Sequence, residues 1–403
     1  MDFPRLTHLY TLPKQYPAYD FSNTVLVAIQ HLLGTNGTLL ELLDNLGLPY
    51  EQMYVLGKVY STNEDVYHEL KRRGAYVHRD SMRLGKAQLT IDYKVALRRA
   101  ANQLVEKALA RLAKLQGSKT LLVVDDGGVL VDCVNRRSHD ITAQIVGVEQ
   151  TRSGANALRA IPRLTFPVIN VAESSAKLQD ESPFIAASIV KSITRKMPHL
   201  PQGKSLRDCN ALVVGYGAVG KNVAIQLKPL VRSIEIYDIV STPGVSVITN
   251  LKLALKGKDL IVGCVGSSWL PNRCHELLPA GVVLASGSSS NSEFLGIEIN
   301  HRQSVNHQLL GNQAIDCAHA DYAFANGRGW VLNAGFPVNF SGEVHAVDPV
   351  EIELTRVLML SGILQALTVE TKPGLQKLEV KFRLPNASHN SSASKSHLSS
   401  SRV

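Results

Sequence analysis

The glycine pattern G-x-G-x-x-G that begins at Gly215 constrains this chain more than any other feature of its sequence. A short apolar run, 211–214, precedes the pattern, and a helical pattern, 220–230, follows it. In such a unit, Gly215 permits a tight turn, Gly217 lets the backbone approach a pyrophosphate, and Gly220 allows the helix to pack closely on the strand. The positive end of the helix would face the anion. The loop residues that we expect to bind a dinucleotide are Gly215, Gly217, Ala218, Val219 and Gly220.

The acidic residue Asp238 follows the next apolar run, 233–237. It lies about 20 residues beyond the glycine pattern, where dinucleotide-binding units place a carboxylate. There it would accept hydrogen bonds from a ribose 2′-hydroxyl and repel a 2′-phosphate, so the sequence predicts NAD rather than NADP as the cofactor. Two further apolar runs, 260–262 and 282–285, predict additional strands. The alternative is a glycine-rich turn that binds nothing, but strand, loop, helix and acid all stand in the expected order.

The first half of the chain also predicts helices and strands in alternation. Residues 25–29 and 39–43 recur with helical spacing, which predicts two amphipathic helical segments. The runs 53–57 and 120–124 are short, apolar and followed by turn residues, as buried parallel strands are. A long helical pattern, 93–115, lies between them. We therefore expect an α/β layer architecture in this half.

Composition limits the classes of function. The 403 residues are 45% hydrophobic and 19% charged, which predicts a globular protein of more than one domain. The formal charge is +9, but only 6% of residues are aromatic and the basic stretches 71–73 and 98–99 lie in helical patterns, so we expect no nucleic-acid partner. Five widely separated cysteines disfavour a disulfide framework and a metal site. No apolar stretch approaches the ~18 residues of a membrane span, and we expect a cytoplasmic protein without a membrane partner.

Four motifs follow one another along the chain: D-D-G-G at 125–128, E-Q-T-R-S-G at 149–154, I-N-V-A-E-S-S-A-K at 169–177 and G-Y-G-A-V-G-K at 215–221. Together they resemble the S-adenosylhomocysteine hydrolase family, which has D-D-G-G, E-E-T-T-T-G, I-N-V-N-D-S-V-T-K and G-Y-G-D-V-G-K in this order. The resemblance extends over about residues 25–367. It implies a two-lobed α/β fold, in which a Rossmann-type NAD-binding domain is inserted into a discontinuous α/β substrate domain.

The resemblance also implies an organisation of the chain. We expect the first part of the substrate domain at 1–190, the NAD-binding domain at 191–340, a helix that returns to the substrate domain at 341–382 and a disordered Ser-rich tail at 383–403. It further implies a homo-oligomer, a nucleoside as the small-molecule substrate and a place in one-carbon metabolism.

The family's reaction gives roles to individual residues. In that family, bound NAD oxidises the 3′-hydroxyl of the nucleoside, homocysteine is eliminated, water adds and the ketone is reduced again. The resemblance implies four catalytic residues: Lys177, Glu181 beside the ribose hydroxyls, Asp126 as a second base and His31 near the 5′ atom. It also implies further cofactor contacts by Thr151, Ser153 and Asn333, and substrate contacts by Gln150 and Ser182.

Each of these residues has a simpler alternative role. Lys177 fits an exposed structural lysine, Asp126 fits a polar turn after a strand, and His31 fits a helix surface. Thr151 and Ser153 fit the cap of a helix that begins near residue 154.

The sequence also departs from the family at residues that would contact the substrate. Gln150 replaces a glutamate that contacts the adenine amino group, Ser182 replaces an asparagine, and Glu181 is longer than the family's aspartate. Leu33 replaces a threonine, and Thr35 stands where many members have a glutamate. These changes reduce the polar contacts that the family makes.

Two family histidines have no counterpart. The stretch 285–294 contains no histidine, and Phe336 stands in place of the other. The family's C-terminal lysine and tyrosines are likewise missing from the Ser-rich tail. Three functions therefore stay open: a hydrolase of this type, an NAD-dependent dehydrogenase of another sugar or hydroxy acid, and a non-catalytic NAD-binding protein.

Overall fold

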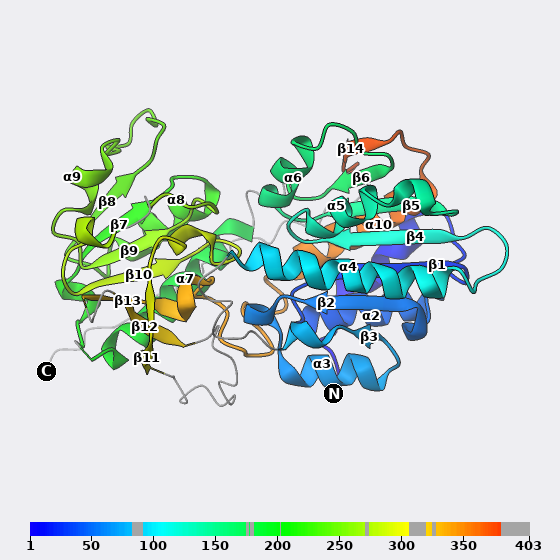
Figure 1. Ribbon diagram of the computed structural model, residues 1–403, viewed down its shortest axis with the longest axis horizontal. Helices are drawn as coiled ribbons and strands as arrows, with labels where there is room; N and C mark the ends of the chain where they lie inside the picture. The colour runs from blue at the N-terminus through cyan, green and yellow to red at the C-terminus, as the bar shows by residue number, and fades with distance from the viewer. Residues whose placement is uncertain are drawn as a thin grey trace, which may run out of the picture.

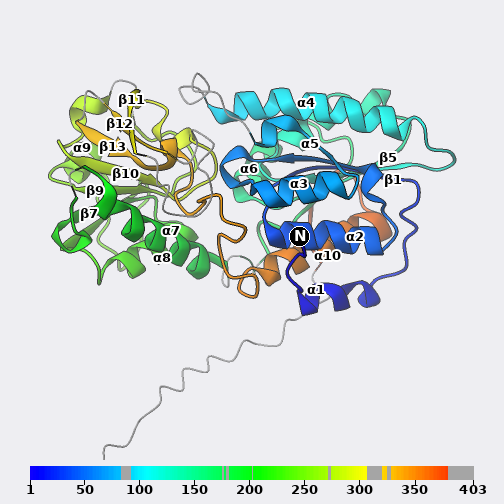
Figure 2. The same cartoon turned by 90° about the horizontal axis from the view of Figure 1, so that it is seen from below.

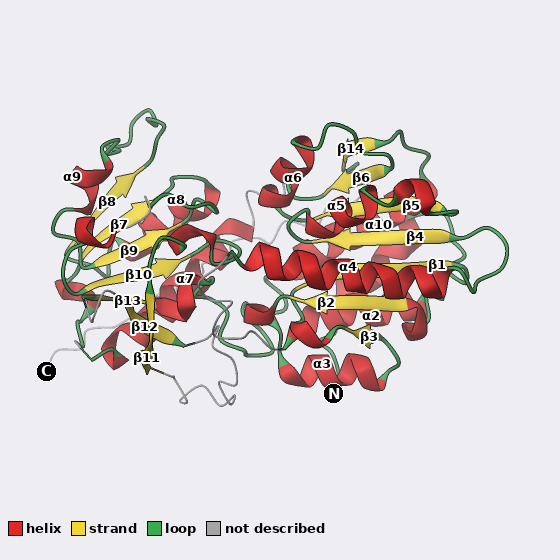
Figure 3. Cartoon of the chain, in the orientation of Figure 1, coloured by secondary structure: helices red, strands yellow, loops and turns green. Residues whose placement is uncertain are grey.

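The computed structural model describes residues 1–82, 92–174, 177, 181–201, 203–270, 274–305, 320–324 and 328–379. The Ser-rich tail expected at 383–403 lies outside these residues. The described part of the chain forms two lobes, each built around a β-sheet that is covered by helices (Figures 1 and 3). The predicted two-lobed α/β fold is therefore confirmed.

Strands from both ends of the described chain form the first sheet, in the order β14-β6-β5-β4-β1-β2-β3. All neighbouring strands pair in parallel. Because β14 returns to pair with β6, this lobe is discontinuous in sequence, and the second lobe is inserted within it. The strands are β1 (Thr24–Gln30), β2 (Met53–Gly57), β3 (Tyr76–Val77), β4 (Thr120–Asp125), β5 (Gln144–Glu149), β6 (Pro167–Asn170) and β14 (Gly374–Lys377).

Helices cover both faces of the first sheet. The side chains of Leu121 and Val123 on β4 pack with α4 and α5, whereas those of Leu122 and Val124 pack with α2, α3 and α10. Figure 2 shows these two helical layers, with α4 on one side and α2 and α10 on the other. The helices are α1 (Thr7–Thr11), α2 (Gly34–Asn45), α3 (Glu64–Arg72), α4 (Tyr93–Leu112), α5 (Val129–Asn135), α6 (Arg152–Arg159) and α10 (Glu353–Thr368).

One predicted helix is wrong. Residues 25–29 belong to strand β1, between β2 and β4. Every residue of β1 is buried, because helices cover both faces of the sheet. A strand buried on both faces is continuously apolar and lacks the alternation that distinguishes a strand from a helix. The helix predicted at 39–43 and the strands predicted at 53–57 and 120–124 are confirmed.

The second sheet has the order β11-β12-β13-β10-β9-β7-β8. Its pairs from β13 to β8 are parallel, and β12 and β11 extend it in antiparallel fashion. Parallel strands on both sides of β7, with connecting helices, are a Rossmann-type arrangement. The elements are α7 (Ser182–Lys196), β7 (Asn210–Val214), α8 (Ala218–Leu227), β8 (Ser233–Tyr237), α9 (Leu251–Leu255), β9 (Leu260–Gly263), β10 (Val282–Ser286), β11 (Ile299–Val305), β12 (Asp321–Phe324) and β13 (Gly329–Val331).

Each sheet has one point where the strand order reverses. In the first sheet it lies between β1 and β4, because β2 and β3 continue on one side and β5 and β6 on the other. In the second sheet it lies between β7 and β9. In open α/β sheets, ligands bind beyond the carboxyl ends of the strands at such a point. The topology therefore offers one ligand position in each lobe.

Side chains from the two lobes meet beyond the carboxyl ends of β1 and β2. The backbone amide of Tyr93 donates to Oδ1 of Asn291 at 3.0 Å. The rings of Tyr60 and Phe336 stack with centroids 5.0 Å apart.

Of the helices in the described ranges, not one combines the length and the apolar character needed to span a bilayer.

Candidate functional site

The carboxylate of Asp126 lies at the centre of a cluster at the switch point of the first sheet. Asp126 follows β4 and is 1% exposed. It accepts hydrogen bonds from Nζ of Lys58, which follows β2, and from Nε2 of Gln150, which follows β5. Nε2 of His31, which follows β1, lies 3.1 Å from Asp126 Oδ2. The carboxyl ends of four parallel strands thus bring these side chains together.

The charges of this cluster are fixed by the pairing of Asp126 with Lys58. Burial alone would raise the pKa of Asp126, but Lys58 and then His31 hold it well below its usual range. Burial alone would lower the pKa of Lys58, but the Asp126 carboxylate raises it above its usual range. The two side chains therefore form a charged ion pair inside the protein.

His31 is hydrogen-bonded on both ring nitrogens. Its Nδ1 lies 2.5 Å from the hydroxyl of Ser61, and its ring stacks on Phe340 with centroids 4.8 Å apart. Burial lowers the pKa of His31 below its ordinary value, although Asp126 opposes this shift. The imidazole is therefore neutral at neutral pH.

Lys177 and Glu181 join this cluster from the segment that leads into α7. Nζ of Lys177 donates to the backbone carbonyl of Gln150 at 2.6 Å and lies 3.7 Å from Oε2 of Glu181. Ser182 is the residue that follows Glu181, begins α7 and is buried. The structure thus brings four predicted residues, His31, Asp126, Gln150 and Lys177, into one connected cluster, with Glu181 at its edge.

Three buried polar atoms of this region have no hydrogen-bond partner among the described residues. They are Oε1 of Gln150, Oε2 of Glu181 and Nη1 of Arg356. A buried polar group without a partner costs about 1–3 kcal/mol. Several such atoms around one cluster are expected where a polar ligand completes the hydrogen bonds.

Arg356, in α10, was missed by the sequence predictions. It is 5% exposed, and its Nε donates to the hydroxyl of Thr35 at 3.2 Å. Burial lowers the pKa of Arg356 to about 10, against the opposing effects of Glu181 and Asp126, so the guanidinium is charged at neutral pH. The available signal was an arginine directly before the largely apolar stretch 357–367.

Lys58 was also missed, although its position offered a signal. It directly follows the predicted strand 53–57, at the end of the strand where ligand-binding residues gather. Nothing in the local sequence indicates that its partner is Asp126, 68 residues further on.

Thr151 and Ser153 occupy the N-terminus of α6. Oγ1 of Thr151 accepts from the amide of Gly154 at 3.1 Å, so Thr151 caps the helix as the alternative interpretation expected. Thr151 also donates to Oε1 of Glu149 at 2.7 Å. Ser153 is exposed, and its hydroxyl lies 3.5 Å from that of Thr151. The expected contacts of these two residues with a cofactor stay predictions.

Asp125 and Glu149 are buried carboxyl groups that face backbone amides. Asp125 accepts from the amides of Asp126 and Val131, and Glu149 accepts from those of Gly127 and Gly128. Burial raises the pKa of both carboxyl groups above their ordinary values. These two carboxyl groups therefore hold the turn that follows β4.

The glycine loop in the second lobe has two crowded glycines and one open one. Gly215 has a φ of +90°, and a Cβ on Gly220 would lie 1.9 Å from the carbonyl oxygen of Gly215. A Cβ on Gly217 would have nothing within 4 Å. Gly215 and Gly220 are thus required by conformation and packing, whereas the space above Gly217, at the start of α8, is where a phosphate could approach. The loop therefore fits a dinucleotide.

Asp238 fixes the glycine loop from the end of β8. Its Oδ2 accepts from the amide of Tyr216 at 2.7 Å, and its Oδ1 accepts from the amide of Val240 at 3.0 Å. The carboxylate is therefore held beside the loop, at the position where the sequence predicts a ribose contact.

Glu293 is a buried carboxyl group that the sequence predictions did not include. It accepts from the amides of Val265 and Gly266 at 3.0 Å each and from Nε1 of Trp269 at 3.1 Å. It also accepts from the hydroxyl of Ser288. The stretch that lacks the family's histidine therefore folds around a buried glutamate instead.

Asn333, an expected cofactor contact, holds the loop that connects the lobes. Its φ is 48°, and its Nδ2 donates to the carbonyls of Pro337 and Phe340 at 3.1 and 2.8 Å. Phe336, which stands where the family has a histidine, packs on Tyr60 within this loop. The loop that Asn333 holds thus places Phe340 on the ring of His31 and Phe336 on the ring of Tyr60.

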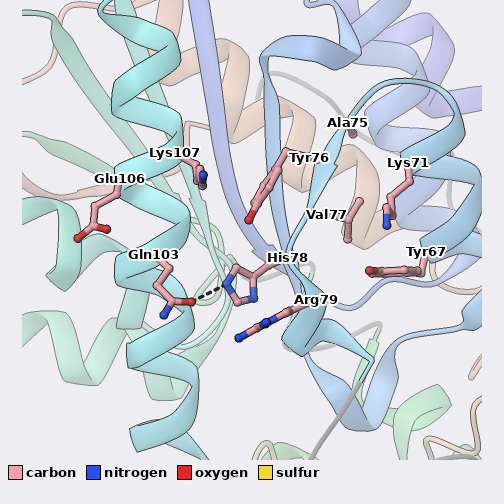
Figure 4. Close-up of a pocket in the computed structure, with 10 residues that line it drawn as sticks. All are labelled: Tyr67, Lys71, Ala75, Tyr76, Val77, His78, Arg79, Gln103, Glu106 and Lys107. Carbon is pink, nitrogen blue, oxygen red and sulfur yellow. Dashed lines mark hydrogen bonds between the residues drawn. The ribbon is translucent and has the colours of Figure 1, made fainter.

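A separate hollow of about 460 Å³ lies at the β3 edge of the first sheet. Figure 4 shows it between α3, α4 and the β3 segment, where Nε2 of His78 lies 3.0 Å from Oε1 of Gln103. Its lining includes no residue of the Asp126 cluster. The hollow is therefore distinct from the candidate site.

Comparisons with known proteins give partial similarities. No protein-family model matches the chain. An uncharacterized protein of Mycobacterium tuberculosis is 33% identical over 349 residues, covering 86% of this chain and 65% of that protein. The adenosylhomocysteinase of Pyrococcus abyssi is 28% identical over 209 residues, covering 47% of this chain and 48% of the enzyme. Both alignments span less than two thirds of the relative's own length.

Among solved structures, NAD+-bound 3-phosphoglycerate dehydrogenase of Entamoeba histolytica matches with a TM-score of 0.34 and 11% identity, covering 65% of this chain and 71% of that one. The chain is thus an α/β protein with a Rossmann-type lobe and a weak, partial sequence similarity to adenosylhomocysteinases.

Proposed function

We propose that this protein binds NAD and acts on the ribose of a nucleoside, in the manner of the S-adenosylhomocysteine hydrolases. One observation carries the proposal. Asp126, His31, Gln150 and Lys177 converge at the switch point of the first sheet, and the buried acceptors Gln150 Oε1 and Glu181 Oε2 lack hydrogen-bond partners among the described residues.

NAD would bind to the second lobe. When bound, it supplies the chemistry of accepting a hydride from a substrate hydroxyl and returning it. The amides at the start of α8 and the open space at Gly217 suit its pyrophosphate. Asp238, already fixed beside the loop, would accept from a ribose hydroxyl and disfavour a 2′-phosphate.

The nucleoside would bind to the cluster of the first lobe. Oε1 of Gln150 can accept from an amino group on the base, and Oε2 of Glu181 can accept from a ribose hydroxyl. Lys177, whose Nζ lies near both residues, is placed to hold or move a proton at the hydroxyl that is oxidised. Water must be excluded from such a site, which the aromatic rings of Phe336 and Phe340 favour.

A second candidate, a non-catalytic NAD-binding protein, is favoured by the state of Asp126. Its carboxylate is occupied by Lys58, His31 and Gln150, and its pKa is held well below the usual range. A carboxylate with so low a pKa is a weak proton acceptor, so Asp126 is poorly suited to act as a general base in this arrangement.

The first test is whether NAD is bound and is reduced by a nucleoside. The full chain is loaded with NAD, and reduced nicotinamide is followed by absorbance after adenosine is added. We expect reduction in the wild type and a large loss of it in Lys177→Ala. Lys191 is exposed on α7, the helix that follows Lys177, so Lys191→Ala is the matched control and should behave as the wild type. Reduced cofactor that stays bound is expected of the hydrolase type, whereas stoichiometric release into solution indicates a plain dehydrogenase.

Two results decide against the proposal. If the protein binds NAD tightly but no nucleoside reduces it, the non-catalytic candidate holds. If Lys177→Ala reduces bound NAD as fast as Lys191→Ala does, Lys177 has only a structural role.

A further inference from the structure

A groove between α4 and the outer strands of the first sheet has one aromatic wall and one basic wall. We call it the edge groove, because β3 is the last strand in the order of the sheet. Its volume is about 500 Å³, and it adjoins the hollow of Figure 4, with which it shares Tyr76 and Lys107. Small-molecule sites have volumes of about 300–1,000 Å³. The lining side chains that carry a charge or an aromatic ring are Glu51, Tyr54, Tyr76, Lys107, Arg111 and Lys114.

The aromatic wall follows from the register of two strands. Tyr54 in β2 and Tyr76 in β3 are direct partners, so their side chains project from the same face of the sheet. The two rings lie with centroids 5.6 Å apart, and both are half-buried. Half-buried aromatic rings offer a surface on which a planar group can stack.

The basic wall comes from α4 and the turn that follows it. Lys107 and Arg111 are four residues apart in the helix, and Lys114 follows its end. None of these three side chains forms an ion pair with a described residue. Nη2 of Arg111 donates to Oε1 of Gln52 at 3.3 Å, whereas its Nε is buried and has no hydrogen-bond partner in the described ranges. A buried donor without a partner costs stability until a ligand supplies an acceptor.

The uncompensated charge of the edge groove and the adjoining hollow is positive. Glu51 is the one carboxylate in the described lining of the groove, and it is exposed. Glu106, in the lining of the hollow, pairs with Arg137 at 3.1 Å. Lys71, on the other side of the hollow, has no ion pair with a described residue. The groove and the hollow together therefore favour an anion.

The surrounding arginines do not extend this charge into a long basic surface. In α3, Arg72 and Arg73 both pair with Glu69. In α4, Arg98 pairs with Asp132. A nucleic-acid strand needs a basic groove that follows its backbone over several nucleotides. A basic surface confined to one groove and one hollow suits a small anion instead.

We propose that the edge groove binds a nucleotide, whose phosphates contact Lys107, Arg111 and Lys114 and whose base stacks on Tyr76. Lysine and arginine side chains are common partners of phosphate groups, and aromatic rings stack with any base. The groove includes no residue of the Asp126 cluster or of the glycine loop. It is therefore a nucleotide site in addition to those of the proposed function, and the inference does not rest on that function.

The experiment compares three ligands on the full chain saturated with NAD, so that the glycine loop is occupied. Binding of uridine triphosphate, inorganic tripolyphosphate and uridine is measured by titration calorimetry at one ionic strength. A uridine nucleotide avoids adenine ligands, which could enter the other two sites. We expect the nucleotide to bind about tenfold more tightly than tripolyphosphate, because its base adds stacking. Uridine, which lacks the phosphates, should bind more weakly than both.

Matched variants test the two walls separately. Lys107 and Lys114 are exposed, so the double variant Lys107→Gln, Lys114→Gln should fold and should bind both phosphate ligands about tenfold more weakly. The control Lys94→Gln, Arg99→Gln loses the same charge from exposed positions of α4 outside the lining and should bind as the wild type does. Tyr76→Leu should bind the nucleotide only as tightly as tripolyphosphate, whereas Tyr76→Phe keeps the ring and its preference.

Four results overturn the inference. Nucleotide binding that is unchanged in the double lysine variant places the ligand elsewhere, and equal affinities for the nucleotide and tripolyphosphate indicate a site for phosphate alone. A single-stranded oligonucleotide that binds the wild type more tightly than the nucleotide, and loses this affinity in the same variant, indicates a nucleic-acid surface. Absence of nucleotide binding also overturns the inference, and it leaves the proposed action on a nucleoside unaffected.

Discussion

The glycine loop and the Asp126 cluster occupy the same kind of position in their two sheets but are filled differently. The loop is tight at Gly215 and Gly220 and open at Gly217. In the cluster, by contrast, the carboxylate of Asp126 is taken up by three side chains of the chain itself. The glycine loop of the second lobe therefore has open space for a ligand at Gly217. The cluster of the first lobe is instead filled by its own ion pairs, and only a few of its buried polar atoms have no hydrogen-bond partner among the described residues.

This difference separates the parts of the site that a ligand could use. A group already in a buried, charged pair destabilises the protein when its partner is removed, and it has little hydrogen-bonding capacity left for a ligand. A buried atom without a partner costs stability until a ligand arrives. Substitutions of the two kinds of group should therefore differ in how much they change the free energy of unfolding and how much they change ligand binding.

The largest effect is expected from breaking the internal ion pair. Asp126→Asn leaves the Lys58 ammonium buried without a counter-charge, which should lower the free energy of unfolding by about 3–5 kcal/mol. Urea-induced unfolding measures this change. Glu106→Gln breaks an exposed ion pair with Arg137 and is the control, which should change stability little. Equal effects of the two substitutions would contradict a buried, charged pair.

Alanine substitutions in the glycine loop should separate a glycine required for packing, Gly220, from one that leaves space for a ligand, Gly217. Gly220→Ala would place a Cβ 1.9 Å from a backbone oxygen, so we expect it to lower the free energy of unfolding by about 3 kcal/mol. Gly217→Ala meets nothing within 4 Å and should leave stability nearly unchanged while weakening the binding of NAD. Urea unfolding and NAD titration measure both quantities. If Gly217→Ala binds NAD as the wild type does, the open space is not the pyrophosphate site.

The buried carboxyl group of Glu293 gives the second lobe a pH dependence. Burial raises the pKa of Glu293 to about 7, above its ordinary value near 4.5. The folded form therefore holds a proton that the unfolded form releases between these values, so stability falls as pH rises through this range. We expect the difference in unfolding free energy between wild type and Glu293→Gln to change by about 2–3 kcal/mol between about pH 5 and about pH 8. A difference that is constant with pH would mean that Glu293 stays ionised throughout.

The sequence predicted the local parts of this arrangement well, because glycines and apolar runs are local signals. The glycine pattern 215–220 spans the turn after β7 and the first residues of α8, as expected, and the strands that precede Asp126 and Asp238 are confirmed. The segment 25–29 was misassigned because a strand buried on both faces carries no alternation.

The pairings within the cluster could not be predicted, because they join distant parts of the chain. Lys58 and Asp126 become partners only when β2 and β4 both flank β1. Arg356 reaches Thr35 only because α10 returns to the first lobe after the whole second lobe. The amide of Asn333 holds the loop of Phe336 and Phe340, and its expected contact with a cofactor stays a prediction. Chain topology, rather than local pattern, decides these contacts.

The smallest effect is expected from Asp238, which combines an internal bond with an expected ligand contact. Its carboxylate accepts from the amides of Tyr216 and Val240, and in the proposed complex it would also repel a 2′-phosphate. Asp238→Asn keeps one of the two oxygen acceptors and removes the negative charge, so the ratio of NADP to NAD affinity should rise about tenfold, as the loss of one repulsive charge predicts. The exposed Asp208→Asn, at the opposite end of β7, is the control and should leave the ratio unchanged. If Asp238→Asn weakens both dinucleotides equally, Asp238 serves only to fix the loop, and the first lobe's pattern of internally satisfied carboxylates extends to the second.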